Sequence, residues 1–192
     1  LQPRYRGPSS INWPMIKVDC ETGLTIFRPT DGLDEGPVIL QKTVAIGPED
    51  TLGSVYFDRL FPLGVEAMLE AADLVVSGRH VETVQDESQA SYEGWCRDAE
   101  AEINWNAHLD TIHNLIRGCD PAPGAWTTVQ GKKVRLFEAR KHPVRRFAEW
   151  RGKPGEIVAI GEQSINIAVQ GGVVEILKVR TDAGQKLSGA AF

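Results

Sequence analysis

Two carboxylates in a glycine-containing turn are the first candidates for chemistry in this sequence. Asp31 and Asp34 lie in residues 30–41, TDGLDEGPVILQ, just before an apolar, β-prone run. Catalytic acids are often found on such loops, because a rigid strand can aim a side chain that the turn leaves accessible. Such an acid can orient and charge a histidine that moves protons during acyl transfer. Spacing alone favours the alternative, ordinary turn chemistry, since Asp bonds its own backbone in turns.

A basic segment, residues 132–153, is the second candidate. It carries nine Lys or Arg and two Glu, a charge of +7 in a chain whose formal net charge is −5. Phe137, Phe147 and Trp150 interleave with these charges, as aromatic residues do on surfaces that follow a phosphate backbone. A solvated rim of mixed charge explains the pattern equally well. The residues that we select for contact with tRNA or another polyanion are Lys132, Lys133, Arg145 and Arg146.

The histidines and cysteines favour structural roles over catalysis or metal binding. His108 and His113 are five residues apart, which does not align two ligands on one helical face, so we expect one packed and one solvated histidine. The three cysteines are well separated and form no CxxC motif, as expected of reduced thiols in a cytoplasmic protein. No window approaches the roughly 18 apolar residues of a membrane helix. We therefore predict no metal site and no membrane segment.

The elements that must position the acidic turn form an α/β segment. The apolar pattern predicts strands over residues 22–27 and 38–46, joined by the turn at 31–36. A short helix should precede them over residues 11–17, capped by Ser9 or Ser10. A polar stretch at residues 79–92 has the composition of an exposed linker.

A long helix is predicted between the second strand and that linker. Asp50 is the expected N-cap, and Gly78 is the expected C-terminal signal. Pro62 and Gly64 should kink or interrupt the helix. A second helix is predicted over residues 107–117, where apolar residues recur on one face.

The composition of the sequence changes after residue 124. Short β-rich runs follow, and glycine-containing turns at residues 130–132 and 170–172 separate some of them. Five short strands of this kind predict a small barrel or OB-like module. The predicted strands cover residues 126–129, 134–139, 156–160, 165–169 and 173–179.

Several motifs in one order carry a resemblance that covers essentially the whole chain. They are GPSSINW at residues 7–13, ETGLTI at 21–26, GLDEG at 32–36, DTL at 50–52, INW at 103–105 and IRGCDPAPGAW at 116–126. In order and spacing this set resembles the formyltetrahydrofolate-dependent formyltransferase family. The resemblance implies a partial Rossmann-like formyltransferase core at residues 1–92, a helical linker at 93–124 and an OB-like β domain at 125–192.

The resemblance also implies a mechanism and a set of site residues. Members of the family take the formyl group of 10-formyltetrahydrofolate and pass it to an amine, or in the hydrolase branch to water. An Asn and a His two residues apart act together with an Asp in a later turn, and by pattern Asp34 is that Asp. Leu1, Gln2 and Pro3 would line the reduced-folate site, although Gln2 stands where Leu is usual. No metal is implied.

One expected part of the site is absent from these 192 residues. The Asn-x-His pair should lie a few residues before Leu1, and none of the four histidines has a matching context. We therefore expect that the chain lacks the N-terminal part of the domain and does not catalyse formyl transfer unaided.

Three functions remain open at this point. The basic segment favours the amino group of methionyl-initiator tRNA as the acceptor, and we rank this first. Local matches such as INW at 11–13 and IHN at 112–114 favour 10-formyltetrahydrofolate hydrolysis, alone or as a domain of a formyltetrahydrofolate dehydrogenase. The third function is an inactive remnant that serves as a binding module. Sugar amines are a further possible acceptor class.

Overall fold

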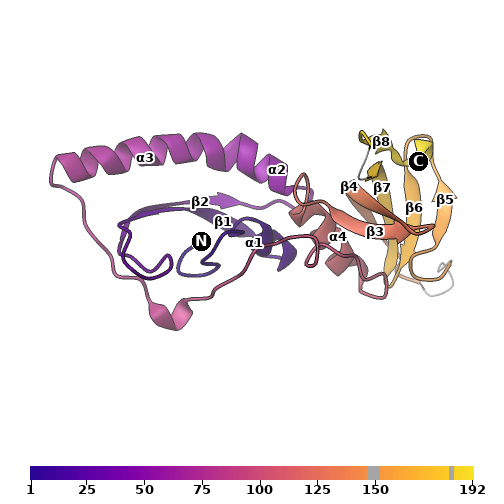
Figure 1. Ribbon diagram of the computed structural model, residues 1–192, viewed down its shortest axis with the longest axis horizontal. Helices are drawn as coiled ribbons and strands as arrows, with labels where there is room; N and C mark the ends of the chain where they lie inside the picture. The colour runs from indigo at the N-terminus through magenta and orange to yellow at the C-terminus, as the bar shows by residue number, and fades with distance from the viewer. Residues whose placement is uncertain (147–151, 182–183) are drawn as a thin grey trace. The chain divides into compact units, whose positions relative to one another are not determined.

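The computed structural model describes residues 1–146, 152–181 and 184–192, and it separates the chain into two units. The N-terminal unit is Leu1–Trp95 and the C-terminal unit is Cys96–Phe192 (Figure 1). The segment 93–124, expected as a helical linker, therefore lies mostly in the C-terminal unit, together with its helix. Each unit is described by itself below.

The N-terminal unit is built on an antiparallel hairpin. Strand β1 (Glu21–Phe27) pairs with β2 (Val38–Ala45), and the register runs from Glu21 opposite Ala45 to Ile26 opposite Leu40. The register shifts between Ile26 and Phe27, where the chain enters the long turn that carries Asp34. Both predicted strands are confirmed, with bounds that differ by a single residue.

A helical layer runs along the hairpin in Figure 1. It consists of α2 (Leu52–Val55), a π turn (Tyr56–Leu60) and α3 (Phe61–Val76). The π turn ends two residues before Pro62, whose missing N–H cannot continue the α-helical hydrogen-bond pattern. The predicted interruption is thus present. Val55 and Leu60 reach from this layer into the core, where they pack with Met15 and Ile46.

The caps of two helices differ from the prediction. Thr51, not Asp50, caps α2, because its Oγ1 accepts from the Ser54 N–H at 3.2 Å while Ser54 Oγ accepts from the Thr51 N–H at 3.1 Å. Asp50 instead accepts from the Gly47 N–H and pairs with Arg59. The short helix α1 (Asn12–Ile16) begins after Ile11 rather than after Ser9 or Ser10.

The polar stretch 79–92 is not an exposed linker throughout. Thr83 and Val38 exchange backbone hydrogen bonds of 2.8 and 2.9 Å, and Tyr92 forms a bridge with Arg6. Between these two attachments, Gln85 is buried with 6% of its surface exposed. The segment packs against the start of the chain and the acidic turn, which local composition could not reveal.

The C-terminal unit is a six-stranded antiparallel sheet with one helix packed on it. Its main strand order is β3-β4-β7-β6-β5, and β8 pairs with β7. Helix α4 (Leu109–Gly118) contacts β4 and β7, and its residues Leu109, Ile112 and Ile116 are each at most 1% exposed. The strands are β3 (Ala125–Val129), β4 (Lys132–Pro143), β5 (Ile157–Ile160), β6 (Ile165–Val169), β7 (Gly172–Thr181) and β8 (Leu187–Ser188).

All five predicted strands and the second helix are present in this unit. Strand β8 was missed, because two residues are too short to show an alternating pattern. The fold class is therefore the expected one, an α/β formyltransferase-type chain whose C-terminal part is rich in sheet. Within the described ranges, no helix has the length and apolar character needed to cross a membrane. The same residues contain no group of three or more potential metal ligands.

Candidate functional site

The Asp34 turn is held in an uncommon backbone conformation. Asp34 has φ = 52°, in the left-handed region that L residues rarely adopt, although Asp is among the more tolerant. Its carboxylate Oδ2 accepts a hydrogen bond of 2.9 Å from the backbone N–H of Gly7. Because Gly7 precedes Asp34 by 27 residues, this bond joins the first loop of the chain to the acidic turn. Asp31, the other candidate acid, is exposed.

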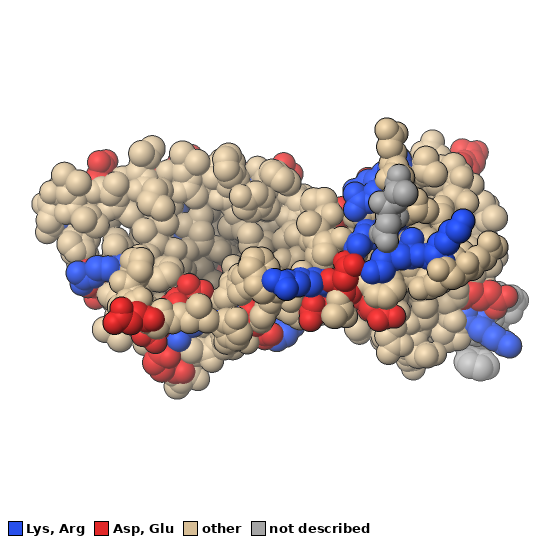
Figure 2. All heavy atoms as spheres, in the orientation of Figure 1, with Lys and Arg blue, Asp and Glu red and all other residues tan. Residues whose placement is uncertain are grey.

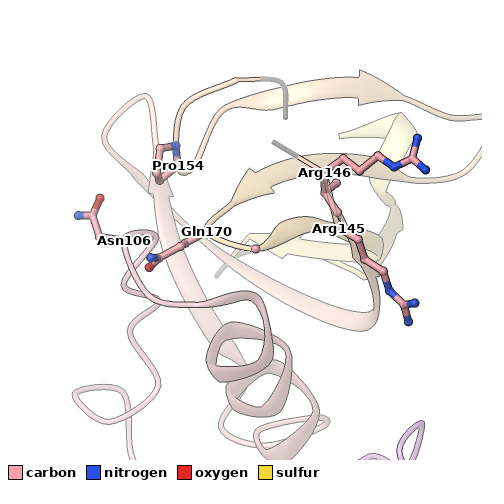
Figure 3. Close-up of a pocket in the computed structure, with 7 residues that line it drawn as sticks. Asn106, Arg145, Arg146, Pro154 and Gln170 are labelled. Atoms are coloured by element: carbon pink, nitrogen blue, oxygen red, sulfur yellow. The ribbon is translucent and has the colours of Figure 1, made fainter. Parts of the chain in front are cut away.

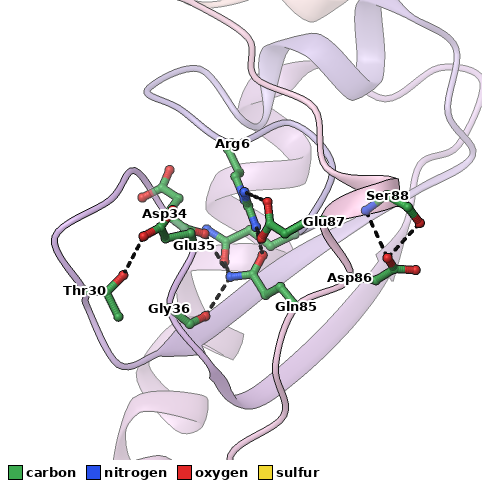
Figure 4. A network of polar contacts seen from close by, with 10 residues as sticks. Arg6, Thr30, Asp34, Glu35, Gly36, Gln85, Asp86, Glu87 and Ser88 are labelled. Carbon is green, nitrogen blue, oxygen red and sulfur yellow. Dashed lines mark hydrogen bonds and ion pairs between the residues drawn. The ribbon is translucent and has the colours of Figure 1, made fainter.

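A buried amide holds the backbone of the same turn (Figure 4). Gln85 Nε2 donates to the carbonyl oxygens of Asp34 and Gly36, both at 2.8 Å. Gln85 Oε1 accepts from the guanidinium of Arg6 at 3.0 Å. Gln85 therefore connects the acidic turn to the loop that also supplies Gly7.

Arg6 is the charged group of this network. It is 8% exposed and makes a two-pronged ion pair with Glu87, with N···O distances of 2.7 and 2.9 Å. The hydrogen bond from Arg6 holds the pKa of the exposed Glu87 carboxyl below its usual value, and the same bond raises the pKa of Arg6. Asp34 and Glu35 add to the negative potential at Arg6. A buried guanidinium is thus neutralised by carboxylates from two separate segments.

The residues expected to line a folate site lie close to this network. Leu1, Gln2 and Pro3 border a cavity of about 520 Å³, and Gln2 and Pro3 also border a second cavity of about 440 Å³ next to β2. Both volumes fall within the range of small-molecule sites. Gln2 Oε1 accepts from Gln85 Nε2 at 3.3 Å, so Gln85 contacts both the Asp34 turn and this loop.

Some basic residues of the C-terminal unit are paired with carboxylates, and others are exposed. Lys133 lies 4.0 Å from the centre of the Trp126 ring and 2.8 Å from Asp98, which also binds Arg135. Arg135 and Lys133 together hold the pKa of Asp98 far below its usual value. Lys132 is exposed at the start of β4. Lys133 is therefore paired with Asp98 and partly buried, whereas Lys132 is the more accessible of the two cations.

Arg145 and Arg146 border a cavity of about 400 Å³ together with Asn106 and Gln170. Figure 3 shows both guanidinium groups directed away from Asn106 and Gln170. Figure 2 shows Lys and Arg side chains gathered on one face of the C-terminal unit. Phe147 and Trp150, which were expected to interleave with the charges, lie outside the described residues.

The histidines take the structural roles expected of them. His113 is 1% exposed and its Nε2 lies 3.2 Å from the carbonyl oxygen of Ala139, while His108 is exposed and its Nδ1 accepts from the Asp110 N–H at the start of α4. The predicted packed and solvated pair is confirmed.

Two of the three cysteines lie close together, which sequence spacing had not indicated. The Sγ atoms of Cys96 and Cys119 are 3.8 Å apart, and both residues are buried. The hydrogen bond to Cys96, together with burial, raises the pKa of Cys119. These thiols pack the start of the C-terminal unit against the end of α4.

Comparison with known proteins defines the class of this chain. A family model described as "Formyl transferase" matches residues 1–72, and one described as "Formyl transferase, C-terminal domain" matches residues 96–192. The chain is 33% identical, over all of its residues, to methionyl-tRNA formyltransferase of Geotalea daltonii, and covers 59% of that protein. It is 42% identical over 137 residues to the human mitochondrial 10-formyltetrahydrofolate dehydrogenase, covering 71% of this chain and 15% of that protein.

A solved structure agrees with these matches. HypX from Aquifex aeolicus, in complex with tetrahydrofolic acid, superposes with a TM-score of 0.78 at 26% identity, over 97% of this chain and 32% of that one. The chain belongs to the formyltetrahydrofolate-dependent formyltransferase family. It spans 59% or less of the length of the relatives named here.

The structure adds residues that sequence reasoning did not select. Gln85, Arg6 and Gly7 surround Asp34; Gly7 opens the motif at residues 7–13, whereas Arg6 and Gln85 belong to none of the motifs. A weak signal was available for Arg6, because a basic residue directly before a glycine in a short loop can reach a nearby acid. No signal was available for Gln85, since a single glutamine in a polar stretch looks solvated.

Proposed function

We propose that this chain belongs to an enzyme that transfers the formyl group of 10-formyltetrahydrofolate to an amine, with the amino group of methionyl-initiator tRNA as the acceptor. The carrying observation is the match to methionyl-tRNA formyltransferases over the entire chain, at 33% and 35% identity. This match includes the C-terminal unit and its basic segment, whereas the higher identity to the dehydrogenases covers 71% of the chain. Nothing in this acceptor assignment requires a metal.

Asp34 is the proposed acid of the site. The Gly7 N–H occupies Oδ2, and in the described part of the chain Oδ1 has no hydrogen-bond donor. That oxygen can accept the N–H of an imidazole, hold the ring in one tautomer and stabilise the imidazolium that forms when it takes a proton from the attacking amine. An asparagine side chain would donate to the oxyanion of the tetrahedral intermediate. Both partners belong to the Asn-x-His pair that the family resemblance implies.

The reduced folate would bind at the loop that Leu1, Gln2 and Pro3 form. The fit rests on the two cavities that this loop borders and on their polar lining from Gln2, Gln41 and Thr83. Amide and hydroxyl groups can pair with the donors and acceptors of a pterin ring, and the apolar part of the lining can cover its faces. Gln85 places this loop next to the acid.

Hydrolysis of 10-formyltetrahydrofolate is the second candidate, favoured by the 42% identity to the dehydrogenases. The same Asp34 would serve, with water in place of the amine. The two functions separate by product, because a hydrolase releases formate without any acceptor. Steady-state assays with and without initiator tRNA therefore decide between them.

Replacement of Asp34 tests the assignment. In a polypeptide that carries the Asn-x-His pair ahead of Leu1, Asp34→Asn should lower kcat by roughly 10³- to 10⁴-fold and leave the KM for the formyl donor within about twofold. Asp31→Asn, in the same turn, is the matched control and should leave kcat unchanged. A loss of less than about tenfold in Asp34→Asn would assign Asp34 to the turn alone.

Charge reversal tests the acceptor. Lys132→Glu combined with Arg145→Glu should raise the KM for tRNA about tenfold or more and flatten its dependence on salt, because each lost phosphate contact lowers the slope by about one. Arg79→Glu, an exposed cation of the N-terminal unit, is the control. Unchanged tRNA kinetics in the double variant would remove tRNA as the acceptor and leave the hydrolase assignment.

A further inference from the structure

The inference concerns Gln85, a buried residue that belongs to none of the sequence motifs. Its side chain makes hydrogen bonds to three separate places: the Asp34 turn, the Arg6 loop and Gln2. Since 6% of its surface is exposed, solvent cannot replace these bonds without opening the unit. A buried side chain with this many partners can adopt only one position and orientation.

The orientation of the Gln85 amide follows from its neighbours. Arg6 only donates, so the amide oxygen must face the guanidinium. The amide nitrogen therefore faces the two carbonyl oxygens, of Asp34 and Gly36, each at 2.8 Å. Its two hydrogens point to these two acceptors, and the longer contact of 3.3 Å to Gln2 Oε1 shares one of them. A side chain without N–H donors cannot reproduce the arrangement.

The two carbonyls that Gln85 holds stand on either side of Glu35. The two hydrogen bonds from Gln85 hold the backbone of the turn in the conformation in which Asp34 has φ = 52°. A residue in that region persists when its surroundings over-determine it, and such sites are frequent near catalytic groups. Gly36 lies on the same turn and has no room for a side chain, because a Cβ there would come within 1.8 Å of the Arg28 carbonyl oxygen. The turn is thus held on both sides.

The side chain of Asp34 is held by the same loop that orients Gln85. Arg6 orients Gln85, and the next residue, Gly7, gives its N–H to Asp34 Oδ2. The Arg6–Glu87 ion pair anchors this loop to the segment that carries Gln85 (Figure 4). Backbone and carboxylate of Asp34 are therefore set by one connected group of residues.

We propose that Gln85 is a positioning residue for Asp34: it locks the turn so that Oδ2 stays on Gly7 and Oδ1 faces the reacting histidine. This inference rests on the proposed function, in which Asp34 is the acid. It adds a residue outside the family motifs to the site. It also explains why a glutamine is buried in a stretch of polar composition.

Gln85→Met tests the proposal, because methionine keeps the length of the side chain and lacks both donors. In the polypeptide with the Asn-x-His pair, the variant should lower kcat at least tenfold and leave the KM for the formyl donor within twofold. Gln85→Glu, which keeps a partner for Arg6, should do the same. Ser88→Ala, exposed in the same segment and outside the linings of both cavities, should change neither constant.

A double variant separates positioning from a general effect on the fold. If Gln85 acts through Asp34, then Gln85→Met in the Asp34→Asn background should change kcat by less than twofold. An equal loss in both backgrounds would overturn the proposal while leaving Asp34 as the acid. A negligible effect of Asp34→Asn itself would instead overturn the proposed function, so the two failures are distinguishable.

Amide exchange gives a readout that needs no activity. In the chain of residues 1–192, Gln85→Met and Gln85→Glu should speed exchange of the Gly7 N–H at least tenfold. The Ile46 N–H, bonded to the Cys20 carbonyl at 2.8 Å, reports on the fold and should keep its protection. Unchanged Gly7 protection in either folded variant would overturn the proposal.

Discussion

The two units differ in how much of their apolar surface they cover. In the C-terminal unit the apolar face of α4 is closed by the sheet, and Ile116 is fully buried. In the N-terminal unit α3 lies on a two-stranded hairpin, and Phe61 and Leu69 remain 57% and 65% exposed. A hairpin of two strands can cover only part of such a helix. The N-terminal unit therefore has the smaller core, although it carries the candidate site.

The units also differ in how they use charge. In the N-terminal unit Arg6 is buried and joins segments about 80 positions apart in the sequence. In the C-terminal unit Asp98 joins Lys133 and Arg135 at the surface, with about half of the Asp98 side chain exposed. The comparison indicates that polar contacts organise the first unit and apolar packing organises the second.

Core truncation should show the largest difference between the units. Phe137→Ala, at a fully buried ring, should lower the free energy of unfolding of the C-terminal unit by about 3–5 kcal/mol. Phe61→Ala, at an exposed ring of the N-terminal unit, should cost less than about 1 kcal/mol. Urea titration followed by hydrogen exchange of each unit measures both values. Similar costs at the two positions would contradict the comparison.

Removal of the buried charge should have an intermediate effect. Arg6→Met leaves Gln85 Oε1 and Glu87 without their donor, and should lower the stability of the N-terminal unit by about 2–3 kcal/mol. Arg4→Met, at an exposed ion pair with Asp19, should cost less than about 1 kcal/mol and is the control. If the two variants unfold at the same urea concentration, the Arg6 network contributes no more than a surface pair.

The smallest effect is expected from Asp98 and depends on pH. Its pKa in the folded unit lies below the unfolded value of about 3.9. Its contribution is therefore present above about pH 4 and is lost as the pH falls through the lower, folded-state pKa. Asp98→Asn should cost about 1 kcal/mol or less near pH 7, because the pair is partly exposed, and should flatten the acid side of the stability curve.

Asp110 and Glu175 also have lowered pKa values, through Lys141 for the first and through Ser164 and His142 for the second. They should preserve part of the acid slope in the Asp98 variant. An unchanged slope in Asp98→Asn, measured by urea unfolding between pH 2 and pH 7, would contradict the role given to the Asp98 cluster.

The regular elements could be predicted from the sequence because their signals are local. Alternating apolar residues identified β1, β2 and five strands of the C-terminal unit, and helical spacing identified α4. The turn at residues 30–36 was also visible, since glycine and aspartate favour such conformations. The motif order then pointed to Asp34 within that turn.

The environment of Asp34 could not be predicted, because it depends on contacts between distant segments. Asp34 can be preferred to Asp31 on physical grounds only when its hydrogen bond from the Gly7 N–H is known. In the same way, the burial of Gln85 is understood only from its hydrogen bond with Arg6. The same applies to Lys133, whose ion-pair partner Asp98 lies 35 positions earlier in the chain. A sequence pattern describes the residues next to a position along the chain, and it does not identify the partners that the fold brings to that position from distant segments.

The return of residues 79–92 to the start of the chain affects how members of this family can be divided and recombined. The first family match ends at residue 72, before Gln85 and Glu87. A chimera joined at residue 72 would take the acidic turn from one parent and its buried glutamine from another. A junction between Trp95 and Cys96, where the two units separate, keeps Asp34 with every residue that holds it.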